Sequence, residues 1–146
     1  MPLVDSFMED ERVHRQNLAD AINSISADYK VDSFTRDVTT ASGNQSITGL
    51  GFTPKAVIFL SAIPNTKFMS VGCWGRLSSG CFLDNGATTA DTYTTNNGSF
   101  IFLRQSIVPD DAIGAPGTLD EDGFTIAWTK VGSPTGTAAI TYLALR

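Results

Sequence analysis

The sequence predicts a mainly β protein, an antiparallel β-sandwich or jelly roll with one N-terminal α-helix. Two observations support this fold class. After Tyr29 the chain consists of short apolar runs separated by clusters of Gly, Asn, Asp and Ser, which are typical of strands joined by turns. No segment of helical length and periodicity separates these runs, so a fold of alternating strands and helices is excluded.

Charge divides the chain into two parts. Residues 1–37 contain 12 charged side chains, whereas the 109 residues after them contain 13. We therefore predict two domains: a helical anchor or trimerisation segment, residues 1–31, and a β-sandwich domain, residues 32–146. With 146 residues, of which 42% are apolar, the chain is large enough to form a hydrophobic core of its own.

The N-terminal segment predicts a helix over Ser6–Ser24. Its first residues, Ser6-Phe7-Met8-Glu9, have the pattern of a capping box, in which a Ser hydroxyl and a Glu carboxylate satisfy free backbone N–H groups. Its apolar stripe is continuous only in the C-terminal half, so the helix needs a surface to pack against. That surface is either its own β domain or other copies of the helix. The positions of such a bundle, spaced alternately by four and three residues, are Phe7, Glu11, His14, Leu18, Ala21 and Ile25.

Nine strands are predicted from the apolar runs and the turn residues between them. Their ranges are Ser33–Thr40, Gln45–Thr48, Lys55–Ala62, Phe68–Trp74, Gly80–Leu83, Thr92–Thr95, Phe100–Gln105, Gly123–Lys130 and Ala138–Ala144. Alternation is clean in the eighth strand, where Trp128 shares a face with Phe124 and Ile126 and is predicted to lie in the core.

Three of these strands are apolar on both faces. The run Ala56–Leu60 has no polar face, and the same holds for Phe100–Leu103 and for the last strand, Ala138–Ala144. A half-buried strand alternates apolar and polar residues, so these three are expected to be covered on both sides. A helix, a loop or another copy of the chain could supply the cover.

The segment Val108–Asp122 is expected to be a long loop, rich in Pro, Gly and acidic residues. Its acids (Asp110, Asp111, Asp120, Glu121 and Asp122) could converge on a calcium ion. The turn at Asp122-Gly123 and solvation of the other carboxylates account for them more simply. We therefore predict no metal site and no cofactor.

Cys73 and Cys81 are expected to be reduced thiols in the core, although a bridge across a hairpin is sterically conceivable. Zinc would need two further ligands, and the sole histidine, His14, lies in the N-terminal helix.

The overall charge excludes two classes of partner. A net charge of −5 offers no basic surface for nucleic acid or for an anionic membrane. No apolar run approaches the roughly 20 residues of a membrane-spanning helix. The first residues show no cationic region followed by an apolar one, so we do not expect export by a cleaved signal.

The sequence contains no catalytic constellation. His14 lies on a charged helix, so a nucleophile activated by histidine is not expected. The acids gather in the helix and in one loop, and the motifs of hydrolases, nucleotide-binding proteins and metalloproteases are absent. We predict that the chain is not an enzyme. A sugar-binding module stays open, because Trp74, Tyr93 or Tyr142 would stack on sugar rings if exposed.

Three segments resemble small β-sandwich virion proteins of tailed bacteriophages. They are Gly49–Phe59, Asp122–Thr129 and Tyr142–Leu145, and the similarity covers about residues 40–146, outside the N-terminal helix. Proteins of this kind occur as capsid decoration proteins, head fibres and tail-fibre components. The resemblance implies a protein that works by contact, with copies that bridge capsid subunits and hold them against the pressure of packaged DNA.

We therefore expect a homotrimeric virion protein, made in the host cytoplasm, that decorates or cements the capsid by binding the major capsid protein or another virion protein. The alternative is a receptor- or glycan-binding domain of a head or tail fibre. A carbohydrate-active enzyme would need two carboxylates about 5–9 Å apart. From the apolar excess, the subunit interface is predicted at Val57, Phe59, Phe100, Phe102 and Leu143. The anchoring residues of the helix are predicted to be Phe7, Leu18, Ile22 and Ile25.

Overall fold

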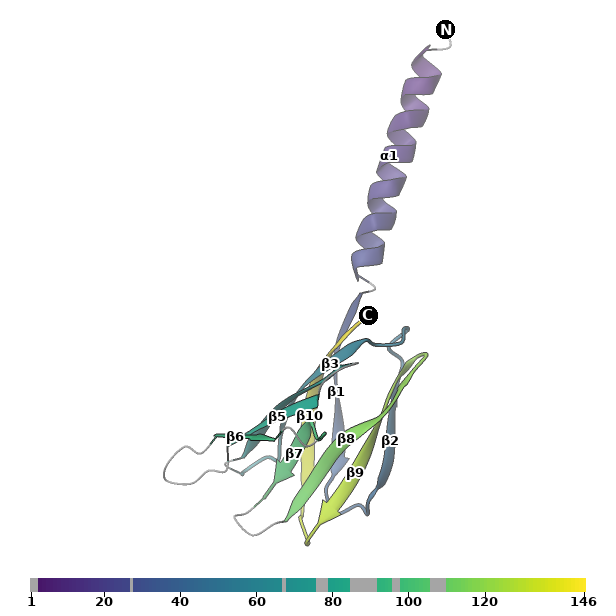
Figure 1. The fold of residues 1–146 in the computed structure, drawn as a ribbon. Helices are drawn as coiled ribbons and strands as arrows, with labels where there is room; N and C mark the ends of the chain where they lie inside the picture. Colours follow the sequence, from purple (N-terminus) through teal and green to yellow (C-terminus); the bar gives the residue numbers. More distant parts are fainter. Residues whose placement is uncertain are drawn as a thin grey trace.

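The computed structural model describes residues 3–26, 28–66, 68–75, 79–84, 92–95, 98–105 and 110–146, without the side chains of residues 3–7, 23–26, 79–84 and 92–95. Two antiparallel sheets lie face to face, and the helix α1 (Leu3–Ser26) projects from one end of them (Figure 1). The C-terminus lies at the same end of the sandwich. The predicted fold class, a mainly β sandwich with one N-terminal helix, is confirmed.

The larger sheet has six strands and the smaller has four. In spatial order, the larger sheet consists of β1 (Tyr29–Asp37), β10 (Thr137–Leu145), β3 (Ala56–Ala62), β4 (Met69–Gly75), β5 (Ser79–Asp84) and β6 (Thr92–Thr95). The smaller sheet consists of β2 (Gly43–Thr48), β9 (Gly123–Val131), β8 (Asp111–Asp120) and β7 (Ile101–Arg104). Every neighbouring pair is antiparallel.

Each of the nine predicted strands overlaps a strand of the structure, with shifts at the ends. The largest shift is at β1, which begins at Tyr29 because its first residue already pairs with Leu145 of β10. Residues 29–31 therefore belong to the sandwich and not to the helical segment. The helix begins at Leu3, so Ser6 lies inside it, and the predicted capping box at its start is wrong.

The prediction of a long loop over Val108–Asp122 is also wrong, because most of that segment forms β8. This strand lies between β7 and β9 and pairs with both. Its ladder with β9 is irregular between Pro116 and Leu119, as in a β-bulge. Gly117 lies in the bulge, where a Cβ atom would collide with the carbonyl of Thr125. Proline and glycine here shape an irregular strand, whereas the sequence pattern indicated a loop.

The core is a cluster of aromatic rings contributed by both sheets. Phe59 of β3 stacks on Phe100 with ring centroids 4.6 Å apart, and Trp74 of β4 also stacks on Phe100, at 5.3 Å. Phe124 of β9 meets Phe59 and Tyr142 edge-on, at 5.6 and 5.3 Å. Trp128 is 3% exposed, so its predicted core position is confirmed. The described residues of α1 contribute nothing to this core, which is complete within the sandwich.

Replacing Phe59 by alanine is expected to lower the free energy of unfolding by about 3–5 kcal/mol, because the change leaves a cavity between two aromatic rings. Urea denaturation measures this loss. Thr129→Ala, on the exposed side of β9, is the control and should change the free energy of unfolding by less than about 0.5 kcal/mol. Equal effects of the two substitutions would contradict the assignment of Phe59 to the core.

Candidate functional site

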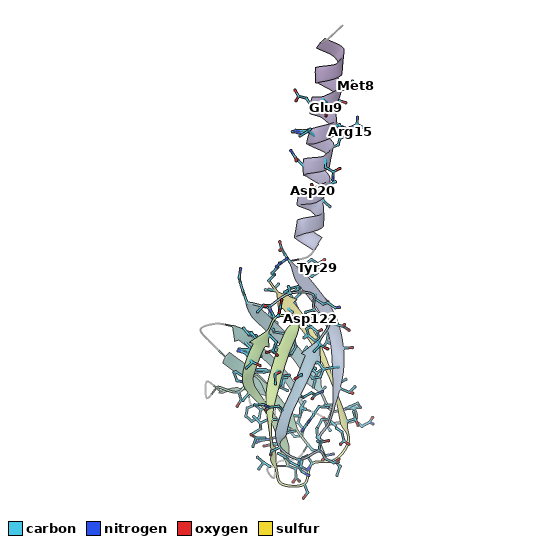
Figure 2. The ribbon with its side chains drawn as sticks, turned by 90° about the vertical axis from the view of Figure 1, so that its right-hand side faces the viewer. Met8, Glu9, Arg15, Asp20, Tyr29 and Asp122 are labelled. Carbon is cyan, nitrogen blue, oxygen red and sulfur yellow. The ribbon has the colours of Figure 1, made fainter. Side chains whose placement is uncertain are left out.

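The helix α1 stands clear of the sandwich. No strand in the described part of the chain packs against it, and its described side chains, residues 8–22, are all exposed. In Figure 2, Met8, Glu9, Arg15 and Asp20 extend from the helix into open space, far from the sheets. Of the two surfaces considered for this helix, its own β domain is therefore not the one used.

Two of the predicted anchoring residues, Leu18 and Ile22, are 61% and 58% exposed. They lie four residues apart, so they are neighbours on one side of the helix, where they form an unpacked apolar strip. The side chains of the other two, Phe7 and Ile25, lie outside the description. The anchoring role stays a prediction for all four residues.

Local polar contacts along α1 do not replace the missing packing. Arg12 pairs with Glu9 at 2.6 Å and Arg15 with Glu11 at 3.3 Å, and both pairs are exposed. Exposed pairs at these spacings add little to stability because water screens them. A helix of 24 residues held only by such pairs is marginal in water.

The base of the helix is tied to the sandwich through the backbone. The carbonyl of Asp28 accepts a hydrogen bond from the N–H of Arg146 at 2.8 Å, which joins the helix exit to the C-terminus. Two residues further on, the Lys30 ammonium donates to the carbonyl of Gly49 at 2.8 Å. The Asp122 carboxylate accepts hydrogen bonds from the N–H groups of Gly49 and Gly51 at 3.0 and 2.6 Å. Tyr29 and Asp122 both lie at this end in Figure 2.

The acids of the segment 108–122 do not converge on a cation. Asp111 forms an ion pair with Arg104 at 2.9 Å, and Asp120 accepts a hydrogen bond from the Thr125 hydroxyl at 3.0 Å. Asp110 accepts one from the N–H of Ser133 at 2.8 Å. Asp111 and Asp120 are the two ends of β8, about 30 Å apart along the strand. Among the described residues, no group of three or more His, Cys, Asp or Glu could hold a metal ion.

The structure does not bear out a core position for Cys73, which is an exposed free thiol. In β4 the inward positions belong to Ser70, Gly72 and Trp74, and Cys73 has the opposite parity. The side chain of Cys81 lies outside the description.

Four of the five residues predicted for the subunit interface are buried within the chain itself. Val57, Phe59 and Phe100 have no exposed surface, and Phe102 is 8% exposed with Ile113 packed against it. Val57, Phe59 and Phe100 belong to the core between the sheets, whereas Phe102 lies on the outer side of β7, with the parity of Arg104, and packs with Ile113. Their interface role stays a prediction that this burial within the single chain does not favour. The strand β7 that carries Phe102 is thus covered on both sides by the chain itself, as predicted. Leu143 is half-buried on an outer surface, and its interface role stays a prediction.

The other two strands that are apolar on both faces, β3 and β10, lie side by side and are covered on one face only. Their outward residues Ile58, Leu60 and Leu145 are 42%, 52% and 38% exposed. The neighbouring strands β1 and β4 continue this surface with Val31 (61%) and Met69 (46%). The cover expected from the sequence is therefore missing on this side.

We call the outward positions of these four strands the uncharged face, leaving out the last outward pair at the end remote from α1, Asp37 and Thr137, which places one carboxylate at its border. They follow from the strand pairings as Tyr29, Val31, Ser33 and Thr35 of β1, Ala139, Thr141, Leu143 and Leu145 of β10, Ala56, Ile58, Leu60 and Ala62 of β3, and Met69, Val71, Cys73 and Gly75 of β4. None of these residues carries a charge.

The outer surface of the smaller sheet has a different character. Arg104 and Asp111 form their ion pair there, across β7 and β8. On β2 and β9 the hydroxyls of Ser46 and Thr125 lie 2.9 Å apart, and Thr125 also donates to Asp120. The apolar pair Phe102 and Ile113 on this surface is mostly buried, whereas the exposed large apolar residues of the described strands all lie on the larger sheet.

The aromatic residues considered as sugar platforms do not form one. Trp74 and Tyr142 are 6% and 3% exposed and belong to the core cluster. The side chain of Tyr93 lies outside the description. Tyr29, 54% exposed, is the large exposed aromatic residue in the described part of the chain, and it belongs to the uncharged face.

Arg36 is buried at the edge between the sheets. Its guanidinium carbon lies 5.1 Å from the ring centroid of Trp128, and its Nη2 donates to the carbonyl of Ala41 at 3.0 Å. Burial lowers its pKa from the ordinary arginine value. These contacts hold the turn after β1 onto the core, and Arg36 Nε and Trp128 Nε1 are buried there without a hydrogen-bond partner in the described part of the chain.

No protein-family model, curated protein sequence or solved structure matches this chain. No helix in the described ranges is long and apolar enough to cross a membrane. The two surfaces to be explained are the unpacked helix and the uncharged face.

The hydrogen bonds from Gly51 and Gly49 lower the pKa of Asp122 below its usual value. Because the folded pKa is below the unfolded one, the carboxylate stabilises the fold above about pH 4 and loses this effect as the pH falls through the folded pKa. Asp122→Ala should therefore lower the melting temperature at pH 7, and the difference from the unmodified chain should shrink below pH 4. The control is Glu121→Ala at the neighbouring exposed position, and an equal effect of both changes would contradict this role.

Proposed function

We propose that this chain is a structural virion protein of a tailed bacteriophage, a capsid decoration or cement protein that acts as a homotrimer joined through α1. The observation that carries the proposal is the helix itself, which projects from the sandwich with Leu18 and Ile22 exposed. The body folds around a core to which the described part of the helix adds nothing, so the function of α1 lies outside its own subunit.

Association of several helices would bury the apolar strip that a single helix leaves exposed. In a parallel bundle, Leu18 and Ala21 would face their counterparts from other copies, and the apolar strip would leave water. Glu11 and His14 occupy the same seam nearer to the N-terminus, where polar residues set register and oligomeric state at some cost in stability. Both side chains are exposed in the single chain and thus available for this.

The virion role rests on the resemblance in residues 40–146 together with the character of the surfaces. The described part of the chain has no cluster of potential metal ligands, and among its buried polar groups Arg36 holds the turn after β1 while Ser70 accepts a hydrogen bond from the N–H of Phe102. A protein that strengthens a shell works through contact area, and here two apolar surfaces are exposed on one small chain.

The alternative, a receptor-binding domain of a fibre, is favoured by a different observation. The end of the sandwich remote from α1 carries the turns after β1, β3 and β9, which are rich in Thr, Ser, Asn and Gly. A helical stalk with polar loops at its far end suits a fibre tip. We rank this second because the described loops present no exposed aromatic platform for a sugar.

The oligomer is tested by replacing Leu18 and Ile22 together with serine. Light scattering on the purified chain should show a trimer for the unmodified protein and a lower mass for the variant, because serine removes the apolar strip. The matched control is Gln16→Ser with Asp20→Ser, which breaks the 3.0 Å hydrogen bond between these exposed residues and changes helix propensity by a similar total amount. A trimer that survives Leu18→Ser with Ile22→Ser contradicts the role of α1.

The virion role is tested separately by mass spectrometry of particles produced from the genome that encodes the chain. The chain should be present in purified particles in many copies per capsid. Particles without it would contradict the proposal, whatever the oligomeric state of the isolated chain.

A further inference from the structure

We propose that the uncharged face is a second homotypic interface, through which the sandwiches of neighbouring copies pack against one another around the axis defined by α1. This inference rests on the proposed function, because α1 brings the copies together. The occupant of the face is thus a second copy of this chain.

The first argument is the missing cover. In β3 the inward residues Val57 and Phe59 are fully buried, while the alternate residues Ile58 and Leu60 are about half exposed although they are equally apolar. In the described part of the chain, α1 points away from the face and the smaller sheet covers only the opposite side (Figure 1). A contiguous exposed apolar surface of this kind marks a site of association.

The second argument concerns the chemistry of the partner. The chain has 10 basic and 15 acidic residues, yet the outward positions of four adjacent strands hold a single one, Asp37, at the end of β1 remote from α1. Depletion of charge is typical of the centre of a protein interface. A charged partner, such as nucleic acid or an acidic or basic protein surface, would find no complement here. An identical uncharged surface is a suitable match.

The third argument is area. Strands about 4.8 Å apart, with same-side residues about 6.7 Å apart, give four strands of four residues a flat area of about 500 Å². In a trimer each face is shared between two neighbours, so each pair of copies buries at most about 500 Å² in total, which is below the usual size of a specific interface. The helix bundle adds further buried area. The face is therefore too small to hold copies together firmly by itself and large enough to do so once α1 has joined them.

The fourth argument is continuity with the helix. Tyr29, at one corner of the face, follows the end of α1 at Ser26 by three residues and pairs with Leu145. Bundled helices lie about 8–10 Å apart, so this corner of each copy would lie close to the same corner of the others. Joining the helices raises the effective concentration of the faces and favours their contact.

The surface of the uncharged face is also uneven, which favours close packing against a neighbouring copy. Leu60 and Met69 border a shallow hollow of about 350 Å³ whose floor includes the small residues Ala62 and Ala139. A leucine or methionine side chain of a neighbouring copy would fit such a hollow. The contact would then bury side chains that are about half exposed in the single chain.

Cys73 provides a reporter, because it lies opposite Ile58 in the β3–β4 ladder, within the face. The experiment measures the rate at which a maleimide modifies Cys73 in the full-length oligomer, with the modified residue located by peptide mass spectrometry. A buried interface should slow the reaction at least about tenfold relative to the variant Ile58→Gln with Leu60→Gln, in which two polar amides open the face without placing a charge beside the thiol. The matched control, Thr48→Gln with Thr129→Gln, adds two amides to exposed positions of the other sheet and should leave Cys73 protected.

The outcomes separate this inference from the role of α1. If the unmodified oligomer reacts at Cys73 as fast as the variant, the face is open and the inference is wrong, while a helix-based oligomer stands. Protection that appears only on intact particles would assign the face to another virion protein and would also overturn the inference. If Cys73 stays protected when Leu18 and Ile22 are replaced by serine, the uncharged face is supported as an interface and the proposed role of α1 is contradicted. A full-length chain that remains monomeric overturns both.

Discussion

The structure depends on one constraint, the burial of apolar side chains that strands direct alternately to two faces. In β3 one set of alternate residues, Val57 and Phe59, forms the aromatic core with Phe100 and Phe124. The other set, Ile58 and Leu60, is as apolar as the first but lies on the outside. The chain thus buries the apolar residues on one face of β3 and leaves those on the opposite face exposed. The projecting helix shows the same imbalance, because its large described apolar residues, such as Leu18 and Ile22, are exposed.

The two exposed apolar surfaces, the strip on α1 and the uncharged face, meet at Tyr29, where the chain passes from α1 into the sandwich. The hydrogen bonds at this junction run from Arg146 to Asp28, from Lys30 to Gly49, and from Gly49 and Gly51 to Asp122. They tie the start of β1 to the C-terminus and to the turn between β8 and β9. These hydrogen bonds fix the base of each helix to its own sandwich. Association of the helices would therefore hold the adjacent ends of the sandwiches close together.

The sequence predicted the architecture well because alternation and turn residues are local signals. It missed β8, since Pro116 and Gly117 are read as loop residues although they shape a bulge. It located the excess of apolar residues in β3 correctly, but the residues of β3 that it chose for the interface, Val57 and Phe59, are the buried ones. A run such as Ala56–Leu60 has no polar residue to show which parity faces the core, and Ser61 is itself buried. Cys73 was misplaced for the same reason. The register with β10 and β4 decides these points, and it is a long-range property.

The most direct test of the account is sedimentation equilibrium of the full-length chain over a wide range of concentration. We predict one oligomeric species with three times the 15.6 kDa mass of the chain, because the helix strip and the uncharged face are satisfied together only in an assembly. A single-chain mass at every concentration would contradict the account, since both apolar surfaces would then be stable in water without a partner.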